Sequence, residues 1–324
     1  MDNKRIYSYI TVATICLSLW AQTAMAGNLI HGRWQASAAT MSVSTSRYVT
    51  WLSGDPDSSE KDAYNVACTQ AKNESPGAVV LGFGRQLPGA VSQFQGRRSP
   101  KALAEVQRTL VAYANGLSAC SDKAKGWVLV AQTSSDHLND PVLASEFGTV
   151  WASLVLAVRE QTSETRVEVR GGSDIEPGWG SYEAARAWTE SYADAAPGTL
   201  LIAPSADGCP QQIGGSKCAN GWTIEGLAYL TWGIDPEHQV YPQVYHYKGA
   251  QARQWAVIAQ EAVRQGLTPL FGGIMTQDRA CSRPGVHCTQ TGNTPEVSLA
   301  QINTAFAELG IDISLSKVTD IGWG

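Results

Sequence analysis

Strand-like and helix-like segments alternate along almost the whole chain, and this alternation constrains the fold more than any other feature of the sequence. Eight short β-branched or aromatic runs have the composition of strands, and they cover residues 47–53, 78–84, 127–133, 166–176, 199–203, 239–246, 268–274 and 317–323. Longer amphipathic runs lie between them, at residues 58–72, 100–119, 141–160, 182–195, 223–230, 250–265 and 295–309. The pattern is typical of parallel strands joined by helical crossovers.

Eight strands with helical crossovers favour a closed (β/α)8 barrel, the α/β fold known as the TIM barrel, over residues 47–324. An open doubly wound sheet would use the same alternation, but no large antiparallel interruption divides the strands. Proline supports three helix starts, since Pro100, Pro141 and Pro295 stand where first turns are expected. Gly266 follows a predicted helix as a C-cap.

The N-terminus has the organisation of a cleaved export signal. Two basic residues precede an apolar run over residues 6–20, and an Ala-Met-Ala cleavage site ends at residue 26. The apolar run is shorter than the ~20 residues of a spanning helix, which argues against a membrane anchor. We therefore expect a signal peptide over residues 1–26, an arm over residues 27–46 and a secreted or periplasmic mature protein. No later stretch is expected to be long enough to span a membrane.

Six of the seven cysteines follow the signal sequence, and they are Cys68, Cys120, Cys209, Cys218, Cys281 and Cys288. An even number in an oxidising compartment indicates three disulfides, although six cysteines allow fifteen connectivities. The second two and the last two are each close enough in sequence to close a small loop, which leaves Cys68 to pair with Cys120. A metal site would need closely spaced Cys or His residues such as C-x-x-C, and the sequence has none.

Charge and motifs argue against several classes of function. The formal net charge is −5, from 29 acidic and 24 basic residues, so no general attraction to nucleic acid or to an anionic membrane is expected. Gly82-Phe83-Gly84 follows a predicted strand but lacks the third glycine of a dinucleotide fingerprint. The sequence has no H-E-x-x-H motif and no EF-hand loop. We therefore expect no cofactor and no metal.

Two acids at the end of the fourth predicted strand are the strongest candidates for chemistry, because the strand ends of a TIM barrel carry its active site. Asp174 and Glu176 are two residues apart, so both point to the same side of an extended strand, roughly 7 Å apart at the backbone. Like charges this close raise a pKa, which is how a carboxyl group keeps the proton of a general acid. Gly171 and Gly172 beside them would allow close approach of a ligand.

The D-x-E pair resembles the carboxylate arrangement of family 18 chitinases and endo-N-acetylglucosaminidases, and of family 25 muramidases. The sixth strand, with Gln243 and Tyr245, is similar to the strand whose Tyr or Gln contacts the N-acetyl group of the sugar. The eighth ends in Trp323, similar to the Trp that floors the sugar subsite in family 18. The resemblance implies a (β/α)8 fold, Glu176 and Asp174 as catalytic carboxylates, and a glycan or polysaccharide ligand.

The resemblance has one departure. Family 18 enzymes have a further Asp two residues before the pair, where this chain has Gly172. The stretch GGSDIEPGWG, over residues 171–180, also resembles a group of exported bacterial proteins in the glycosidase barrel superfamily. The departure makes a glycan-binding barrel without catalysis the main alternative to an enzyme.

Aromatic residues near the predicted strand ends fit a saccharide ligand, because rings offer a large contact area to a sugar face at low entropic cost. Trp179 follows the acidic pair and Trp323 ends the last strand, whereas core packing is the stronger expectation for Trp222 and Trp232. Three hypotheses follow: an exported glycoside hydrolase with Glu176 as the general acid, a non-catalytic glycan-binding TIM barrel, and an exported structural protein whose carboxylates pair with arginine.

Overall fold

The computed structural model describes residues 40–93, 99–121, 126–286 and 288–324. The expected signal peptide and most of the expected arm lie outside the described residues. The strands are β1 (Ser42–Tyr48), β2 (Ala78–Leu87), β3 (Ala90–Ser92), β4 (Lys101–Ala102), β5 (Val128–Ser134), β6 (Glu168–Asp174), β7 (Leu201–Ile202), β8 (Gln239–Val240), β9 (Ile274–Thr276) and β10 (Lys317–Trp323). The helices are α1 (Pro56–Asn73), α2 (Leu103–Cys120), α3 (Pro141–Gln161), α4 (Tyr182–Ala195), α5 (Ile224–Ala228), α6 (Ala250–Arg264), α7 (Asp278–Cys281) and α8 (Pro295–Glu308).

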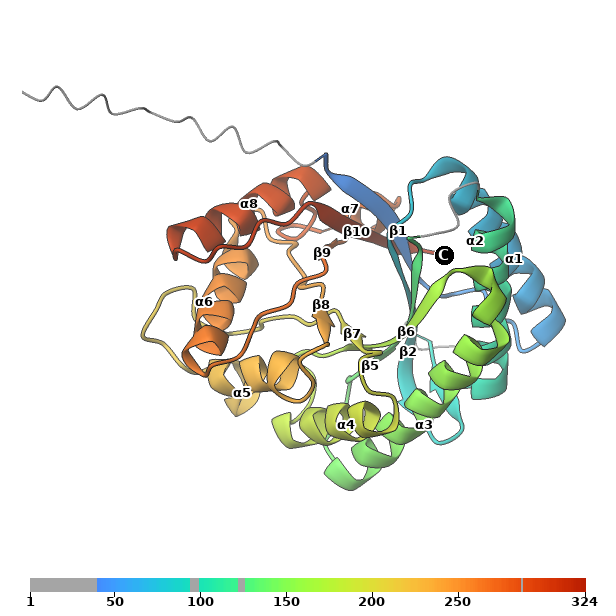
Figure 1. The fold of residues 1–324 in the computed structure, drawn as a ribbon, viewed down its shortest axis with the longest axis horizontal. Helices are drawn as coiled ribbons and strands as arrows, with labels where there is room; N and C mark the ends of the chain where they lie inside the picture. Colours follow the sequence, from blue (N-terminus) through green and yellow to red (C-terminus); the bar gives the residue numbers. More distant parts are fainter. Residues whose placement is uncertain (1–39, 94–98, 122–125, 287) are drawn as a thin grey trace, which may run out of the picture. The chain divides into compact units, whose positions relative to one another are not determined.

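Parallel pairing closes the strands into a barrel, which confirms the predicted TIM-barrel fold. Ladders join β10 to β1, β1 to β2, β2 to β5 and β5 to β6 on one side, and β7 to β8 and β9 to β10 on the other. Parallel bridges close the two remaining gaps: Gly171 with Leu200 joins β6 to β7, and Gln243 with Met275 joins the chain after β8 to β9. The helices surround this barrel as an outer ring (Figure 1).

Two apolar layers hold the barrel together. One fills the barrel and includes the buried side chains of Val80, Val130, Leu201, Met275 and Ile321. The other lies between strands and helices and includes Val79, Leu81, Trp127, Trp151 and Trp255. Neighbouring residues of β2 belong to different layers because successive strand side chains point to opposite faces. Each large apolar side chain buried in this way stabilises the fold by about 1.5–3 kcal/mol.

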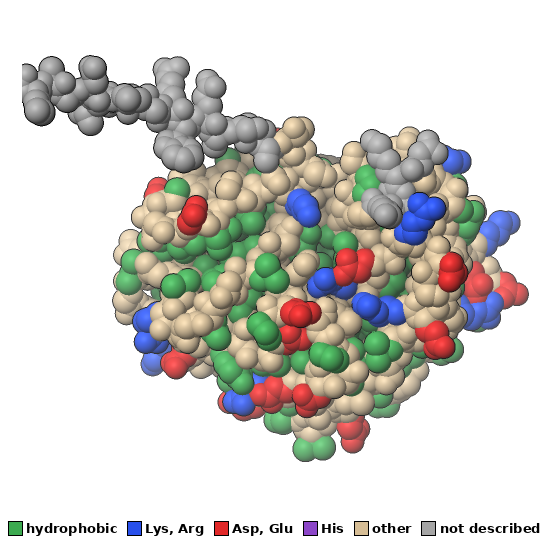
Figure 2. All heavy atoms as spheres, in the orientation of Figure 1, with side chains coloured by type: hydrophobic (Ala, Val, Ile, Leu, Met, Phe, Trp, Pro, Cys, Tyr) green, Lys and Arg blue, Asp and Glu red, His purple; other side chains and the backbone are tan. Residues whose placement is uncertain are grey.

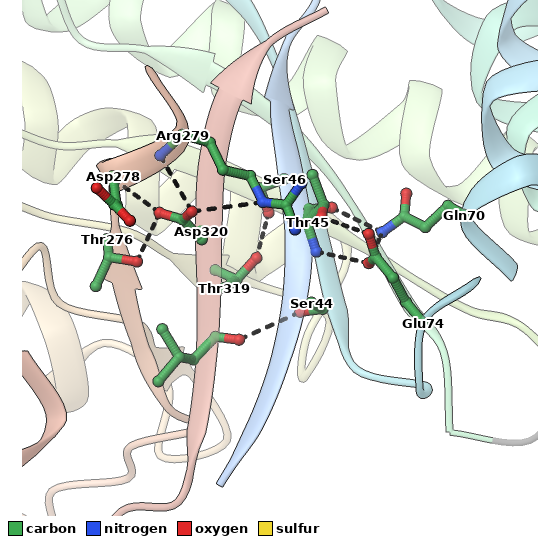
Figure 3. A network of polar contacts seen from close by, with 11 residues as sticks. Ser44, Thr45, Ser46, Gln70, Glu74, Thr276, Asp278, Arg279, Thr319 and Asp320 are labelled. Atoms are coloured by element: carbon green, nitrogen blue, oxygen red, sulfur yellow. Dashed lines mark hydrogen bonds and ion pairs between the residues drawn. The ribbon is translucent and has the colours of Figure 1, made fainter. Parts of the chain in front are cut away.

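The barrel interior beside β1 and β10 is polar. Ser44 Oγ donates to a backbone carbonyl of β2 at 2.5 Å. The hydroxyls of Ser46 and Thr319 hydrogen-bond to each other (Figure 3). Hydroxyls that satisfy one another can be buried at little cost. The prediction of a first strand at residues 47–53 is wrong because the strand begins among these buried hydroxyls and not in an apolar run. The strand begins at Ser42, and its serine- and threonine-rich start lacks the apolar alternation that marks a strand.

The strand before the last is shorter and later than predicted. The prediction placed it at residues 268–274, and β9 covers Ile274–Thr276. Pro269 has no backbone N–H for a ladder. The two glycines that follow make room for the ring of Tyr241, since a Cβ on Gly272 would lie 2.2 Å from that ring. Packing against an aromatic side chain therefore replaces regular pairing just before β9.

A small hairpin that was not predicted lies between β2 and α2. β3 pairs antiparallel with β2, and β4 pairs antiparallel with β3. Lys101 belongs to this pairing, so the helix expected from Pro100 begins at Leu103. The other prolines stand as predicted, because Pro141 and Pro295 occupy the first turns of α3 and α8.

Three disulfides join the cysteines in the expected pairs. Cys68–Cys120 links α1 to α2, Cys209–Cys218 closes a loop between β7 and α5, and Cys281–Cys288 closes a loop at the end of α7. Disulfides form and persist in oxidising compartments. The three bonds therefore indicate an extracellular or periplasmic protein.

Helix α3 corrects one expectation about membranes. Among the described residues it is the one helix that is long and apolar enough to cross a membrane, with 21 residues and a mean hydropathy of 1.5 over its most apolar window. Its side chains Phe147, Trp151 and Val155 are buried in the outer apolar layer. The high hydropathy is thus accounted for by packing against the barrel, as in the core helix of a globular domain.

Acidic and basic side chains are interspersed over the face of the molecule drawn in Figure 2. This mixture agrees with the small net charge of −5. A surface of mixed sign gives little long-range attraction for a polyanion.

Candidate functional site

Strand β6 carries the candidate acids to the C-terminal end of the barrel. The strand ends at Asp174, and Glu176 follows two residues later. Ser135 fixes this end of the chain, because its Oγ donates to the Asp174 carbonyl at 3.0 Å and accepts from the Glu176 N–H at 3.3 Å. The N–H of Trp179 then donates to the Glu176 carbonyl at 3.0 Å. Backbone contacts thus fix both acidic residues.

The two glycines before the acids serve packing. A Cβ on Gly171 would lie 2.1 Å from the hydroxyl oxygen of Tyr192 in α4, and a Cβ on Gly172 would lie 2.7 Å from Val130 Cγ1 inside the barrel. Side chains at these positions would therefore clash on both sides of β6. Packing therefore accounts for both glycines, and the close approach of a ligand that the sequence suggested is not needed to explain them.

The acids meet at the side-chain amide of Gln243, which follows β8. Gln243 Nε2 lies 2.7 Å from Asp174 Oδ1, 3.1 Å from Glu176 Oε1 and 3.0 Å from the Ala203 carbonyl oxygen. Two acid oxygens that contact one nitrogen at these distances are at most about 6 Å apart. The structure therefore brings three predicted site residues into one cluster.

Burial raises the pKa of both carboxyl groups. Asp174 is 4% exposed and Glu176 is 9% exposed, and loss of water disfavours the charged form of a carboxyl group. The charge of Asp207 raises the pKa of Asp174 further, and the charges of Asp174 and Asp207 do the same for Glu176. Hydrogen bonds from Gln243 lower both pKa values in part. The balance favours a pair that keeps a proton near neutral pH.

The hypothesis of an exported structural protein requires an arginine that pairs with the carboxylates of Asp174 and Glu176. Within the described ranges, no ion pair includes Asp174 or Glu176. An isolated acid pair is costly to bury, because no opposite charge compensates for the lost water. The arginine partner that this hypothesis needs is not found among the described residues.

A third acid, Asp207, stands beside the pair and was not predicted as a site residue. It lies in the loop after β7, and its Oδ2 would be 2.8 Å from a Cβ on Gly178. Its carbonyl accepts from the Ala219 N–H at 2.8 Å, and the Cys209–Cys218 disulfide closes the same loop. Its place just past a barrel strand is the sequence signal that could have identified it.

Aromatic rings lie next to the acids. Tyr48 and Trp323 are register partners on β1 and β10, with ring centroids 4.7 Å apart. Burial raises the pKa of the Tyr48 hydroxyl, and the charges of Asp174 and Glu176 raise it further. Burial also raises the pKa of Tyr245, and the Tyr48 hydroxyl and the charges of Asp174 and Glu176 raise it further. Tyr48, which was not predicted as a site residue, therefore contacts Trp323 and lies near enough to the acids to feel their charge.

The predicted tryptophans fall into two groups. Trp179 and Trp323 are partly exposed. Trp222 is buried and donates from Nε1 to the Gly180 carbonyl at 2.9 Å, and Trp232 is buried against Trp255 with ring centroids 6.4 Å apart. Trp222 and Trp232 are therefore core residues, as expected, and Trp179 and Trp323 are the ones with surface left for a ligand.

Asp320 at the end of β10 shows what a structural acid looks like in this barrel. Its carboxylate accepts from Thr276 Oγ1 at 2.8 Å, from the Asp278 N–H at 2.9 Å and from the Arg279 N–H at 3.2 Å, and Arg279 Nε lies 3.5 Å away (Figure 3). These contacts tie β10 to β9 and α7. The carboxyl groups of Asp174 and Glu176 share one donor, the Gln243 amide, whereas the Asp320 carboxylate accepts hydrogen bonds from several donors.

No group of three or more His, Cys, Asp or Glu side chains within the described part of the chain is arranged to hold a metal ion. The chemistry that these residues can supply by themselves is proton transfer and charge stabilisation by the three acids.

No protein-family model and no curated protein matches the chain. Among solved structures, a GH5-4 broad specificity endoglucanase from an uncultured bacterium shares 11% identity with a TM-score of 0.43, over 89% of this chain and 88% of that chain. A D-psicose 3-epimerase shares 11% with a TM-score of 0.43, over 87% and 85%. PbGH5A, a glycoside hydrolase family 5 enzyme from Prevotella bryantii B14, shares 9% with a TM-score of 0.39, over 80% and 78%. These similarities are too distant to assign a family or a function.

Proposed function

We propose that the protein is an exported glycoside hydrolase that acts on a polysaccharide or cell-wall glycan. The observation that carries the proposal is the buried acid pair, Asp174 and Glu176, at the strand ends of a TIM barrel. The ring of Tyr48, near the pair, and the ring of Trp323 next to it support a sugar ligand, because such rings combine a large contact area with few rotatable bonds. The resemblance of the D-x-E pair to glycosidase motifs supports the same class of substrate.

Glu176 is the general acid in this proposal. It is the more exposed of the two acids, and its raised pKa keeps the proton that the leaving oxygen needs when the glycosidic bond breaks. Asp174, once ionised, attacks the anomeric carbon as the protonated leaving oxygen departs, and water that gives its proton to the now ionised Glu176 then releases the sugar from Asp174. Gln243 positions both carboxyl groups by its hydrogen bonds to them.

The spacing of the acids supports retention of configuration at the anomeric carbon. Inverting enzymes keep their carboxyl groups about 6.5–9.5 Å apart to admit a water molecule, and retaining enzymes keep them about 5–5.5 Å apart. The two oxygens that contact Gln243 Nε2, at 2.7 and 3.1 Å, are closer than the inverting range allows.

The test is a panel of neutral and acidic glycans incubated with the wild type and with Glu176→Gln. We expect the wild type to release reducing ends from at least one glycan, with retained configuration in the first product by proton NMR. Glu176→Gln should lose roughly a hundredfold or more of this activity while it still binds the same glycan. Glu190→Gln, on the exposed surface of α4, is the matched control and should keep full activity.

Two outcomes would contradict the proposal. Equal hydrolysis by the wild type and Glu176→Gln would reject Glu176 as the acid. Equal binding by both proteins without hydrolysis of any glycan would support the alternative, a non-catalytic glycan-binding barrel. The missing Asp at Gly172 is the sequence observation that favours this alternative.

A further inference from the structure

A cavity of about 160 Å³ lies at the ends of β2, β5 and β6, and its lining includes Ser173, which precedes Asp174 in the chain. Arg85 to Pro88 line it from the hairpin after β2, and Asp136 to Leu138 line it from the loop after β5. Phe147 and Trp188, from α3 and α4, give it buried apolar walls. The volume is below the range of about 300–1,000 Å³ typical of drug-sized ligands, so the cavity suits one substituent or ring and not a long chain of sugars.

The walls of this cavity are already held by hydrogen bonds. Gln86 Nε2 donates to the Phe147 carbonyl at 2.9 Å, and Trp188 Nε1 donates to Gln86 Oε1 at 3.2 Å. The N–H of Asp136 donates to Ser134 Oγ at 3.1 Å. The cavity is therefore preformed, and a ligand would not have to order these side chains.

Arg85 is the cation of the cavity, and it is partly buried there. In the part of the chain that the structure describes, no carboxylate forms an ion pair with Arg85. The acid that shares the cavity, Asp136, lies 3.5 Å from His137 Nε2 at the rim. A partly buried guanidinium without a carboxylate partner presents its donors to an anion from outside the chain.

The sheet register relates Arg85 to the acid pair. Arg85 pairs with Ser134 on β5, and Ser134 pairs with Asp174 on β6. The three residues thus form one row across neighbouring strand ends, and two strand spacings separate Arg85 from Asp174 by about 10 Å at the backbone. At the backbone, Arg85 is therefore within the length of a short oligosaccharide from Asp174.

We propose that this cavity is an anion subsite and that the substrate is an acidic glycan. Arg85 binds a carboxylate carried by a sugar residue next to the one whose bond is cleaved at Glu176. The inference rests on the proposed function and adds the chemical class of the substrate to it. The contact is a charge-assisted hydrogen bond, which a planar guanidinium can make through two parallel N–H groups.

The test measures binding by calorimetry with uronic-acid oligosaccharides, each paired with its neutral, carboxyl-reduced form. All binding measurements use the Glu176→Gln protein, so that hydrolysis does not consume the ligand, and the other substitutions are added to it. This protein should bind an acidic member roughly tenfold or more tightly than its neutral form. Adding Arg85→Gln should remove that preference, and adding Arg85→Lys should keep part of it. Arg186→Gln, which removes an exposed guanidinium paired with Glu190 on α4, is the matched control and should leave the preference intact.

The outcomes separate the subsite from the function. Equal binding of acidic and neutral forms, with no effect of Arg85→Gln, would overturn the anion subsite and leave the proposed function standing. An acidic preference that survives Arg85→Gln would overturn the role of Arg85. Failure to bind any glycan, neutral or acidic, would overturn both the subsite and the proposed function.

Discussion

At Asp174 and Glu176, loss of water and a neighbouring carboxylate both oppose ionisation. The alternation of side chains along a strand was enough to predict that these two acids share a face. The sequence could not predict that Gln243 donates to the acids instead of facing a substrate, or that Asp207 adds its charge. Both contacts depend on how the ends of β6, β7 and β8 meet in space.

Gln243→Met tests the positioning role of the amide. Loss of a hydrogen-bond donor raises the pKa of a carboxyl group, so activity should persist to higher pH on the alkaline side of the profile. The value of kcat should fall by roughly tenfold to a hundredfold, because the acids are no longer held in place, while KM changes little. The measurement is kcat and KM against pH on the glycan that the wild type cleaves.

Gln70→Met is the matched control for this variant. Gln70 is also buried, and its Nε2 donates at 2.8 Å to the Thr45 carbonyl, between α1 and β1. The control removes a similar amide and should leave the pH profile in place. If both variants gave the wild-type profile, Gln243 would have no positioning role.

Asp207→Asn should shift the alkaline side of the pH profile of activity to lower pH, opposite to the shift expected for Gln243→Met. Its charge raises the pKa of both acids, so a neutral side chain lets them ionise at lower pH, by about one pH unit. Asp194→Asn, on the exposed end of α4, removes an equal charge elsewhere and should not shift the limb. An unchanged limb in Asp207→Asn would mean that Asp207 does not act on the pair.

Among the elements, helices followed the sequence more closely than strands. Helix α4 has the predicted bounds, because Ser181 caps it and the Ser181 side chain accepts from the Ala184 N–H. Strand β1 was misplaced because buried serines fill the barrel there, and apolar alternation does not mark such a strand. A polar interior depends on partners from other strands, such as Thr319 for Ser46, and these are not visible within one segment.

The disulfides should stabilise the elements unequally. Cys68–Cys120 spans 52 residues and Cys281–Cys288 spans 7, and a longer loop restricts the unfolded chain more. Replacing the first pair by alanine should lower the free energy of unfolding by about 4 kcal/mol, against about 2.4 kcal/mol for the second. Urea unfolding of the two double variants measures this. An equal loss, or a larger loss for the short loop, would contradict the loop-entropy account.

For the molecule as a whole, the acid pair is a cost to stability that a functional site can retain. A carboxyl group whose pKa is raised by folding stays protonated in the folded chain while the unfolded chain ionises. The folded state therefore loses stability as the pH rises above 4.5, the ordinary pKa of Glu176, up to the raised value. Below that window both states are protonated and the cost disappears.

The free energy of unfolding of the wild type and Glu176→Gln, measured in urea across the pH range, tests this central claim most directly. The account predicts that the variant is more stable than the wild type at about pH 8, by at least about 1 kcal/mol. It also predicts that the difference shrinks to zero near pH 4, whatever the substrate proves to be. A difference that does not depend on pH, or a less stable variant at about pH 8, would contradict a proton held by Glu176 at the barrel mouth.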